Sequence, residues 1–296
     1  MNDRGENGAM EEKPVNLIYL LGAGRSGTTM LATILNNHPN IHTVGEMHQF
    51  LDYLLEDKDC SCGENLSLCN FWAPVLNDID LSLLKNKANV ALSNSLEKHH
   101  NIPLLLLGKP LNTTYSAMTD MVFKAIHTKV SKPWLLDSSK YISRYLLLRK
   151  NKNINLKGIY LVRDVRGVVY SFGKNVQTPK NPLSAIFYYS LVNIWAQLVS
   201  LLDRKVIKIR YEDFVNEPEL TIQKIEKHLF GKTENISDLN DKTFDIPHII
   251  AGNRLRSQKQ LVIKKDVKWK EGISRSKQIL YYIAAFPLMA INKYKP

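Results

Sequence analysis

The chain has 296 residues, of which 44% are hydrophobic and 23% are charged. This composition excludes a chain too polar to form a core, and the length is within reach of one large α/β domain. The formal net charge of +12 indicates an anionic partner: nucleic acid, a membrane surface or a highly phosphorylated small molecule. Charge alone does not choose among these, nor does it exclude a basic surface without a specific ligand.

The start of the chain has no pattern typical of secretion. Residues 1–14 are polar and rich in Glu, Asn and Gly, so we expect a disordered lead-in rather than a signal peptide, followed by a single domain over residues 15–296. The apolar stretches at residues 17–21 and 279–291 are too short to span a bilayer. We therefore expect a cytoplasmic protein without a transmembrane segment.

Apolar runs of strand length recur along the chain, with helical patterns between them. The runs are nearly continuous rather than alternating, which is typical of strands buried on both faces of a parallel sheet. They cover residues 17–21, 41–44, 134–136, 159–162 and 206–209. Helices are predicted over residues 28–37, 47–55, 80–98, 115–130, 140–150, 166–173, 182–202, 218–230 and 276–291. The alternation predicts an α/β protein with a three-layer, P-loop-like fold: a central parallel sheet, helices on both faces, and ligands at the carboxyl ends of the strands.

The first predicted strand runs into a glycine-rich loop that opens a helix. The sequence of the loop is Gly22-Ala23-Gly24-Arg25-Ser26-Gly27-Thr28-Thr29. Glycines let successive N–H groups face one point, and the helix start adds further N–H groups and the positive end of its dipole. The pattern predicts an anion site, while a glycine-rich turn that only opens a helix is the simpler alternative.

This loop departs from the pattern of nucleotide triphosphatases at one position. Thr28 stands where those enzymes carry a lysine, and the cation is instead Arg25, on the other side of Gly27. The lysine of nucleotide triphosphatases reaches the β and γ phosphates. A P-loop phosphotransferase such as a kinase would lack its main cation here, so it is the weaker alternative.

Three cysteines, Cys60, Cys62 and Cys69, lie close together in the sequence. Their spacing matches no zinc motif, and a structural zinc site usually needs a fourth ligand, for which His48 is a weak candidate. We therefore predict no metal. Reduced thiols in a loop are the simpler expectation, with one disulfide if the compartment is oxidising.

A second candidate anion site follows the strand at residues 159–162. Arg163 lies at the strand end, and Ser171 follows two helical turns later, so both side chains can close on one small anion. The local Arg-Asp-x-Arg sequence on its own also fits a surface cluster of salt bridges. Its position after a buried strand favours the anion site.

Together these segments resemble the sulfotransferase family that uses 3′-phosphoadenosine-5′-phosphosulfate (PAPS), in its bacterial, carbohydrate-type and tyrosyl-protein-type branches. The resemblance extends from about residue 17 to the C-terminus but is specific only in short blocks. It implies that the phosphosulfate is bound by Gly24, Arg25, Ser26, Gly27, Thr28 and Thr29. Arg25 would contact the bridging oxygen between phosphate and sulfur.

The resemblance also assigns residues to the other end of the nucleotide. Arg163 and Ser171 would hold the 3′-phosphate, a group that ATP lacks. Tyr211, after the strand at residues 206–209, would lie beside the adenine. Arg256, with Arg254 in reserve, would return to the 3′ end from a basic segment, for which a solvated loop is the alternative.

Sulfuryl transfer from PAPS leaves 3′-phosphoadenosine 5′-phosphate (PAP) and requires a base for the acceptor hydroxyl, but no metal. Glu46 is the first candidate, because in the tyrosyl-protein branch a catalytic Glu follows an RSGTT…HP…GE arrangement, matched here with one extra residue. His48 is the rival base, and capping of the next helix is the alternative role for Glu46. Lys140 would steady the transferring sulfuryl oxygens or pair with Asp137.

The sequence thus predicts a sulfotransferase that acts by in-line displacement on an acceptor hydroxyl. A sugar or lipid-linked hydroxyl is favoured, and a tyrosyl or small phenolic acceptor is not excluded. The aromatic residues of the helix at residues 182–202 line an apolar site or, more in keeping with their spacing, belong to the core. A non-catalytic polyanion-binding module explains the charge but not the motifs, and we recognise no motif for nucleic acid. The sequence does not predict the oligomeric state.

Overall fold

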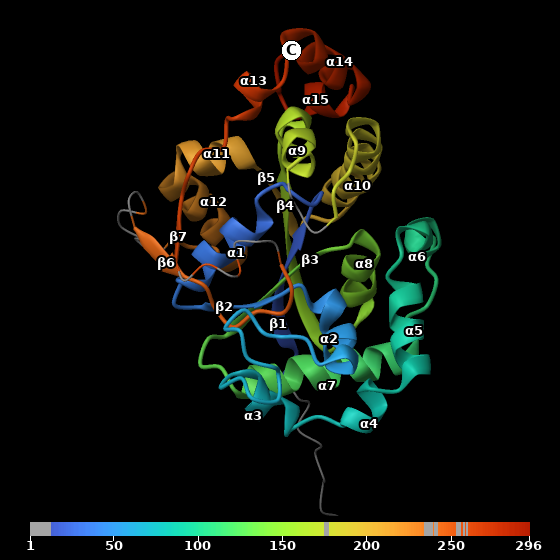
Figure 1. The fold of residues 1–296 in the computed structure, drawn as a ribbon. Helices are drawn as coiled ribbons and strands as arrows, with labels where there is room; N and C mark the ends of the chain where they lie inside the picture. The colour runs from blue at the N-terminus through green and yellow to red at the C-terminus, as the bar shows by residue number, and fades with distance from the viewer. Residues whose placement is uncertain are drawn as a thin grey trace, which may run out of the picture.

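The computed structural model describes residues 13–174, 178–233, 239, 242–252, 256, 258 and 260–296. Five parallel strands form its central sheet, in the order β2-β3-β1-β4-β5 (Figure 1). They are β1 (Val15–Leu21), β2 (Ile41–Gly45), β3 (Trp134–Lys140), β4 (Ile154–Val162) and β5 (Val206–Arg210). Each contains one of the predicted apolar runs. Residues 1–12 of the expected lead-in lie outside the described residues.

Helices cover both faces of the sheet, and the central strand β1 shows why. Leu17 and Tyr19 belong to one buried core, while Ile18 and Leu20 belong to the other, because successive side chains of a strand point to opposite faces. Helices α1 (Thr28–Asn36) and α12 (Pro218–Phe230) lie on one side, and α7 (Thr113–Thr128), α8 (Ile142–Lys150) and α10 (Pro182–Leu202) on the other (Figure 1). The predicted α/β fold with a central parallel sheet is confirmed.

Shorter elements complete the described structure. Strands β6 (Thr243–Asp245) and β7 (Gln260–Val262) pair in antiparallel fashion. The 3₁₀ helices are η1 (Met47–Gln49) and η2 (His99–Asn101). The remaining α-helices are α2 (Phe50–Glu56), α3 (Trp72–Leu76), α4 (Leu81–Leu84), α5 (Lys87–Leu96), α6 (Ile102–Leu106), α9 (Val165–Phe172), α11 (Tyr211–Asn216), α13 (Trp269–Gly272), α14 (Arg275–Ala284) and α15 (Leu288–Ile291).

Two predicted helices are each divided in two. The helix expected over residues 80–98 becomes α4 and α5, because the Asn86 side chain accepts a hydrogen bond from the Ala88 N–H and starts a new helix. The helix expected over residues 276–291 becomes α14 and α15, divided at Pro287, which has no N–H to continue the first helix. Lys140, expected to open a helix, is the last residue of β3.

One helix in the described part of the chain, α10, is long and apolar enough to cross a membrane, with a mean hydropathy of 1.5. Core helices of globular proteins can meet the same criterion. Ala185, Tyr189 and Ala196 are fully buried, and α10 packs on β4 and β5. The opposite side of α10 exposes apolar side chains such as Leu183 and Phe187. In this fold α10 therefore belongs to the layer that covers the sheet.

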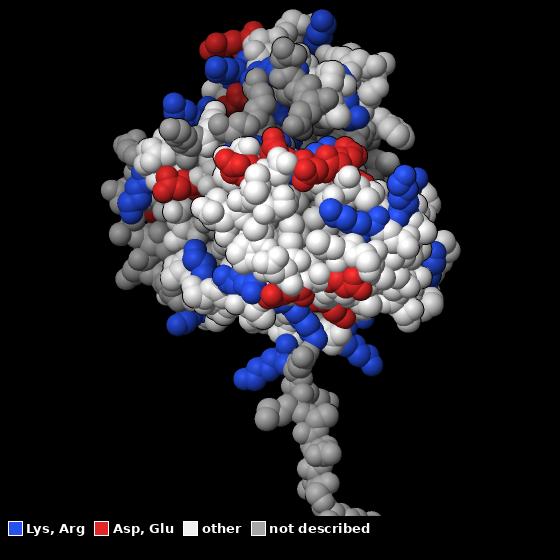
Figure 2. All heavy atoms as spheres, turned by 60° about the horizontal axis from the view of Figure 1, so that its bottom comes forward, with Lys and Arg blue, Asp and Glu red and all other residues white. Residues whose placement is uncertain are grey.

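The excess of basic residues does not gather into one patch on the described part of the face shown in Figure 2. Acidic side chains lie between the lysines and arginines, and uncharged residues occupy most of this surface. Proteins that bind long polyanions concentrate Lys and Arg on one face or along one groove. This face does not favour such a module.

Candidate active site

The segments that follow the five parallel strands meet at one edge of the sheet. The glycine-rich loop follows β1, Glu46 follows β2, Lys140 ends β3, Arg163 follows β4, and Tyr211 follows β5. Parallel strands end on the same side, so residues far apart in the sequence converge there. Two neighbouring cavities lie at this edge, and Arg25 and Gly27 line both of them.

The glycine-rich loop packs tightly and leaves the start of α1 uncapped. Gly27 has a φ of 95°, and a Cβ atom at this position would lie 2.5 Å from the Tyr211 ring, so glycine is required. No side chain caps α1, whose first N–H groups are therefore available to a ligand. The buried Ser26 Oγ has no hydrogen-bond partner among the described residues. The loop thus presents several donors suited to an anion.

The first cavity, which we call the Arg163 cavity, has a volume of about 680 Å³ and is lined by Arg25, Arg163, Ser171 and Tyr211, among others. The Arg25 Nε donates a hydrogen bond to Ser171 Oγ at 3.0 Å, and Arg163 Nη1 donates to the Arg25 carbonyl at 3.2 Å. The Arg163 guanidinium lies over the Tyr211 ring, 4.3 Å from its centre, and pairs with Asp266 at 3.2 Å. Two cations and a hydroxyl donor therefore face one small space.

The second cavity, which we call the Glu46 cavity, has a volume of about 1080 Å³. The helix start at Thr28 and Thr29 lines it together with Glu46 and Lys140. The Lys140 Nζ forms an ion pair with Glu46 Oε1, and the two side chains are only 14% and 12% exposed. Gln49 donates a second hydrogen bond to the Glu46 carboxylate at 3.3 Å. A carboxylate and an ammonium group thus stand beside the glycine-rich loop.

The backbone holds Lys140 in an unusual conformation. Its φ of 72° lies in the left-handed region, which is strained for a residue with a side chain. The alternative pairing of Lys140 with Asp137 is not observed, because Asp137 is fully buried and accepts a hydrogen bond from Arg144 Nε at 2.9 Å. Arg144 in turn pairs with the buried Glu97. This network anchors the end of β3 and leaves Lys140 for Glu46.

His48, the rival base, also lines the Glu46 cavity. Burial, with the nearby charges of Lys140 and Arg144, lowers the pKa of His48 well below its usual value near 6.5, so the ring is neutral at pH 7. The ring packs against Tyr141 with 4.4 Å between ring centres, and its buried Nδ1 has no hydrogen-bond partner in the described structure. Both candidate bases therefore lie in the same cavity.

Arg256 does not line the Arg163 cavity, although a role at the 3′ end of the nucleotide would require it there. Its guanidinium donates a hydrogen bond to the Tyr53 hydroxyl at 2.8 Å and points to the Asp59 carbonyl at 3.5 Å, so it lines the Glu46 cavity. These hydrogen bonds hold the side chain against α2. The reserve candidate Arg254 lies outside the described residues.

The aromatic residues of α10 divide between core and cavity. Tyr189 is fully buried and Trp195 is half-buried against the core, as the helical spacing predicts, while Phe187 is 72% exposed. Tyr188 lines the Glu46 cavity, and its hydroxyl accepts a hydrogen bond from the Gly24 N–H at 3.0 Å. The sequence does not single out this role, because Tyr188 lies within a continuous apolar pattern.

Other residues of the two cavities carry no sequence signal of their own. Lys174 and Asp266 line the Arg163 cavity, where their charged groups lie 3.8 Å apart. Tyr141 and Lys180 line the Glu46 cavity. Asp266 lies in the basic segment that resembles the family but has no role assigned there, and the other three lie outside the recognised motifs.

The model of the sulfotransferase family matches residues 18–231 of this chain. The chain belongs to the sulfotransferase family. Among solved structures, the sulfotransferase domain of the curacin biosynthetic pathway matches at 20% identity and a TM-score of 0.56, covering 96% of this chain and 99% of that one. The sulfotransferase domain of the Synechococcus PCC 7002 olefin synthase matches at 18% identity and a TM-score of 0.56, covering 97% and 98%. These likenesses show a shared fold. Curated protein sequences give no match.

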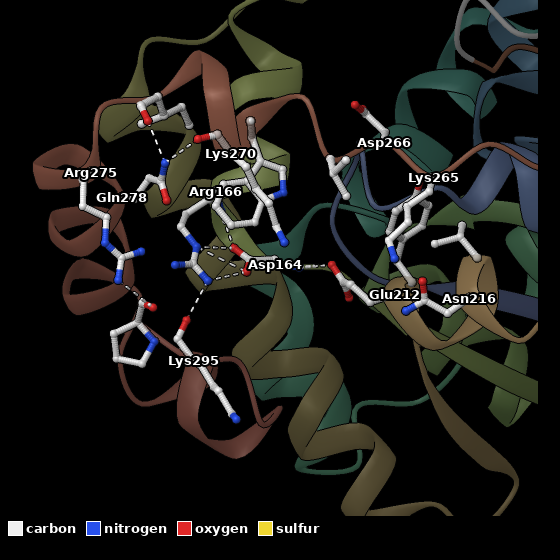
Figure 3. A pocket seen from close by; sticks show the side chains of 16 residues that line it. Asp164, Arg166, Glu212, Asn216, Lys265, Asp266, Lys270, Arg275, Gln278 and Lys295 are labelled. Atoms are coloured by element: carbon white, nitrogen blue, oxygen red, sulfur yellow. Dashed lines mark hydrogen bonds and ion pairs between the residues drawn. The ribbon is translucent and has the colours of Figure 1, made fainter.

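This sulfotransferase has a further cavity of about 660 Å³ between α9, α11 and the C-terminal helices (Figure 3). Arg166 crosses it and bonds Asp164 and the Lys295 carbonyl, each at 2.7 Å. The Arg166 guanidinium also lies 4.5 Å from the centre of the Trp269 ring. Of the two arginines in the Arg-Asp-x-Arg sequence, Arg166 therefore forms the local salt bridge, and Arg163 faces the cavity beside the glycine-rich loop.

The three cysteines of this sulfotransferase are free thiols that gather in space. Their sulfur atoms lie together with a ring nitrogen of His248. His48, the residue considered from the sequence as a fourth ligand, lies instead in the Glu46 cavity. The three thiols thus form, with His248, a cluster of four ligand-type side chains that the sequence does not predict.

Proposed function

We propose that this sulfotransferase moves a sulfuryl group from PAPS to an acceptor hydroxyl. The observation that carries the proposal is the pair of cavities that meet at Arg25 and Gly27. The nucleotide would occupy the Arg163 cavity, its phosphosulfate would lie over the glycine-rich loop, and the acceptor would enter the Glu46 cavity. The reacting sulfur would then lie at the junction.

The donor nucleotide carries two separate anionic groups, and each has a matching set of residues. Arg163 and Ser171 are suited to the 3′-phosphate, because an arginine and a hydroxyl donate charge-assisted hydrogen bonds to phosphate oxygens. The uncapped start of α1 and the buried Ser26 hydroxyl are suited to the 5′-phosphate. Arg25 lies between these two sets.

In the transfer step, the acceptor oxygen forms a bond to sulfur while the bond from sulfur to the bridging phosphate oxygen breaks. Glu46 takes the proton of the acceptor hydroxyl, and the neutral His48 is the second candidate for that role. Arg25 and the loop N–H groups stabilise the charge that develops on the leaving phosphate. Lys140, beside Glu46, faces the sulfuryl oxygens.

The lining of the Glu46 cavity favours a polyhydroxylated acceptor. Polar side chains such as Gln49, Asp52 and Asn94 line it together with the rings of Tyr141 and Tyr188. Amide and carboxylate groups bind hydroxyls, while aromatic rings pack on apolar faces. We therefore favour a sugar or lipid-linked hydroxyl over a wholly apolar phenol.

A comparison of nucleotides tests the proposed donor. In buffer without added magnesium, PAP should raise the melting temperature of the protein more than ATP with magnesium does, since ATP lacks the 3′-phosphate. Adenosine 5′-monophosphate, which also lacks that group, is the matched control and should give a smaller shift than PAP. Equal shifts from PAP and ATP–magnesium would contradict a PAPS donor and favour a phosphotransferase.

A further inference from the structure

Three cysteines and one histidine bring four ligand atoms together outside both cavities. Cys60, Cys62 and Cys69 lie in the loop between α2 and α3, and His248 follows β6. The three sulfur atoms and a ring nitrogen of the histidine all lie within 4.8 Å of one another. Cys60 and Cys69 are buried in the main core, while Cys62 is exposed. The proposed transfer reaction uses none of these side chains.

Three distances among these atoms are close to the edges of a tetrahedron around one zinc ion. Zn–S bonds of about 2.3 Å and Zn–N bonds of about 2.0 Å place neighbouring ligand atoms about 3.5 to 3.8 Å apart. Here Cys62 Sγ lies 3.7 Å from Cys69 Sγ, and His248 Nδ1 lies 3.8 Å from Cys60 Sγ and 3.1 Å from Cys69 Sγ. A disulfide requires two sulfurs about 2.05 Å apart. Small side-chain movements therefore suffice to complete a metal site.

The backbone of the cysteine loop is arranged by its own hydrogen bonds. The Cys60 N–H donates to the Glu64 carbonyl at 2.9 Å, and the Gly63 N–H donates to the Cys60 carbonyl at 3.0 Å. Gly63 has a φ of 90°, which closes the turn directly after Cys62. The Cys69 N–H then donates to the Asn65 carbonyl at 2.9 Å. The loop thus folds back on itself and brings its three thiols to one side.

Hydrogen bonds to the residues before and after His248 hold this histidine against the loop. The Ser61 hydroxyl donates a hydrogen bond to the Pro247 carbonyl at 2.6 Å and accepts one from the Ile249 N–H at 3.0 Å. Ser61 lies between two of the cysteines, so these bonds fix the histidine beside the sulfurs. The Phe71 ring stacks against the imidazole with 6.3 Å between ring centres. The nitrogen is therefore aimed at the thiols by its surroundings.

We propose that Cys60, Cys62, Cys69 and His248 bind one Zn²⁺ ion through three thiolates and Nδ1. Thiolate and imidazole ligands suit Zn²⁺, and four protein ligands complete its tetrahedral shell. No position then remains for water or substrate, so the ion is structural and not catalytic. Each thiol that binds the ion releases its proton.

The ion joins the cysteine loop to the segment that supports Glu46. Ile250, two residues after His248, pairs with the end of β2: its N–H donates to the Val44 carbonyl at 3.0 Å, and its carbonyl accepts from the Glu46 N–H at 2.8 Å. Loss of the ion would remove one of the links between residues 247–252 and the loop, and the Ser61 hydrogen bonds would remain. The backbone that holds Glu46 at the cavity would then be less constrained.

Metal content and metal affinity test this site without any measurement of activity. The full chain, purified and dialysed against excess Zn²⁺ and then against metal-free buffer, should retain one zinc per chain by elemental analysis. Cys62→Ser and His248→Asn should each weaken zinc affinity more than about a hundredfold in competition with a chromophoric chelator, since even indirect contacts to a metal change affinity 10- to 100-fold. His100→Asn, a change at an exposed histidine, is the control and should retain wild-type affinity.

Cobalt substitution gives a second readout of the same site. Co²⁺ added to the metal-depleted wild-type chain should give the visible bands of a tetrahedral thiolate complex, and Cys62→Ser should change them. A wild-type chain that retains no zinc, or ligand variants that bind zinc as tightly as the wild type, would overturn the proposal. A Cys62–Cys69 disulfide found by mass spectrometry of the freshly purified protein would overturn it as well. The zinc and cobalt measurements test the metal site alone, and the comparison of PAP with ATP tests the proposed donor separately.

Discussion

Arg25 connects the two cavities through both its backbone and its side chain. Its φ of 72° turns the loop, its carbonyl accepts a hydrogen bond from Arg163, and its guanidinium donates one to Ser171. With its backbone and its guanidinium each held by a hydrogen bond, Arg25 needs little reorganisation when a ligand arrives. In the proposed reaction this cation stands where the leaving phosphate gains charge.

The proposed base is tested by Glu46→Gln, which keeps the size of the side chain and removes its ability to accept a proton. We expect kcat for sulfuryl transfer to fall about 10²- to 10⁴-fold, while PAP affinity, measured by calorimetry, changes little. Glu271→Gln is the matched control, since Glu271 is an exposed carboxylate that lines neither cavity. A larger loss of kcat in His48→Gln than in Glu46→Gln would assign the base to the histidine.

The residue proposed for the 3′-phosphate is tested by Arg163→Ala. Removal of one charged hydrogen-bond donor costs about 1.5 to 3 kcal/mol, so the preference for PAP over adenosine 5′-monophosphate should fall about 10- to 100-fold in titration calorimetry. Lys174→Ala removes another cation from the same cavity and should reduce this preference much less. If Arg163→Ala keeps the wild-type preference, the 3′-phosphate binds elsewhere.

At the scale of elements, α10 supports the glycine-rich loop through the Tyr188 hydroxyl. Tyr188→Phe removes the acceptor of the Gly24 N–H and should lower the free energy of unfolding by about 1 to 3 kcal/mol, as for other buried groups left unpaired. Phe187→Ala changes the exposed neighbour and should stay within about 0.5 kcal/mol of the wild type in chemical denaturation. Equal effects of the two variants would show that the hydroxyl contributes nothing to the loop.

The strands could be predicted from the sequence because both faces of a parallel sheet are buried. The apolar run at residues 159–162, for example, is the buried end of β4. Helix boundaries were less predictable, because the helical pattern continues across Asn86, and a single capping bond divides it. The hydrogen bond of Tyr188 could not be predicted for a related reason. The sequence marks Tyr188 only as one of several aromatic residues for a cavity or the core, and its hydroxyl becomes a partner of the Gly24 N–H only where the glycine-rich loop approaches α10.

At the scale of the whole molecule, the site residues that directly follow a strand could be predicted from the sequence. Glu46, Arg163 and Tyr211 follow strands, and parallel strands bring such residues together whatever their spacing in the sequence. The positions of Arg256 and His248 depend instead on how the C-terminal segment crosses the end of β2. No local pattern encodes that crossing, so their partners, Tyr53 and the three cysteines, could be found only in the structure.

The stability of the whole molecule should fall as the pH drops below about 6.5. Burial lowers the pKa of His48 in the folded state, so the unfolded state binds one more proton below the usual pKa near 6.5, and acid favours unfolding. His48→Gln removes this proton and should give a shallower fall in unfolding free energy between pH 6.5 and 5, measured by chemical denaturation. Above pH 7 the two profiles should run parallel, and equal slopes below pH 6.5 would contradict the buried, neutral imidazole.

The left-handed backbone of Lys140 lowers the stability of the fold, while its side chain serves the proposed reaction. A non-glycine residue held there costs about 1 kcal/mol or more, which Lys140→Gly would recover, but that change alone would leave the Glu46 carboxylate without its partner. Lys140→Gly combined with Glu46→Gln removes the strain and both charges together. Selection for heat resistance alone would therefore favour this pair of changes, which removes the proposed base. Selection for a more stable enzyme needs a measurement of activity at every round.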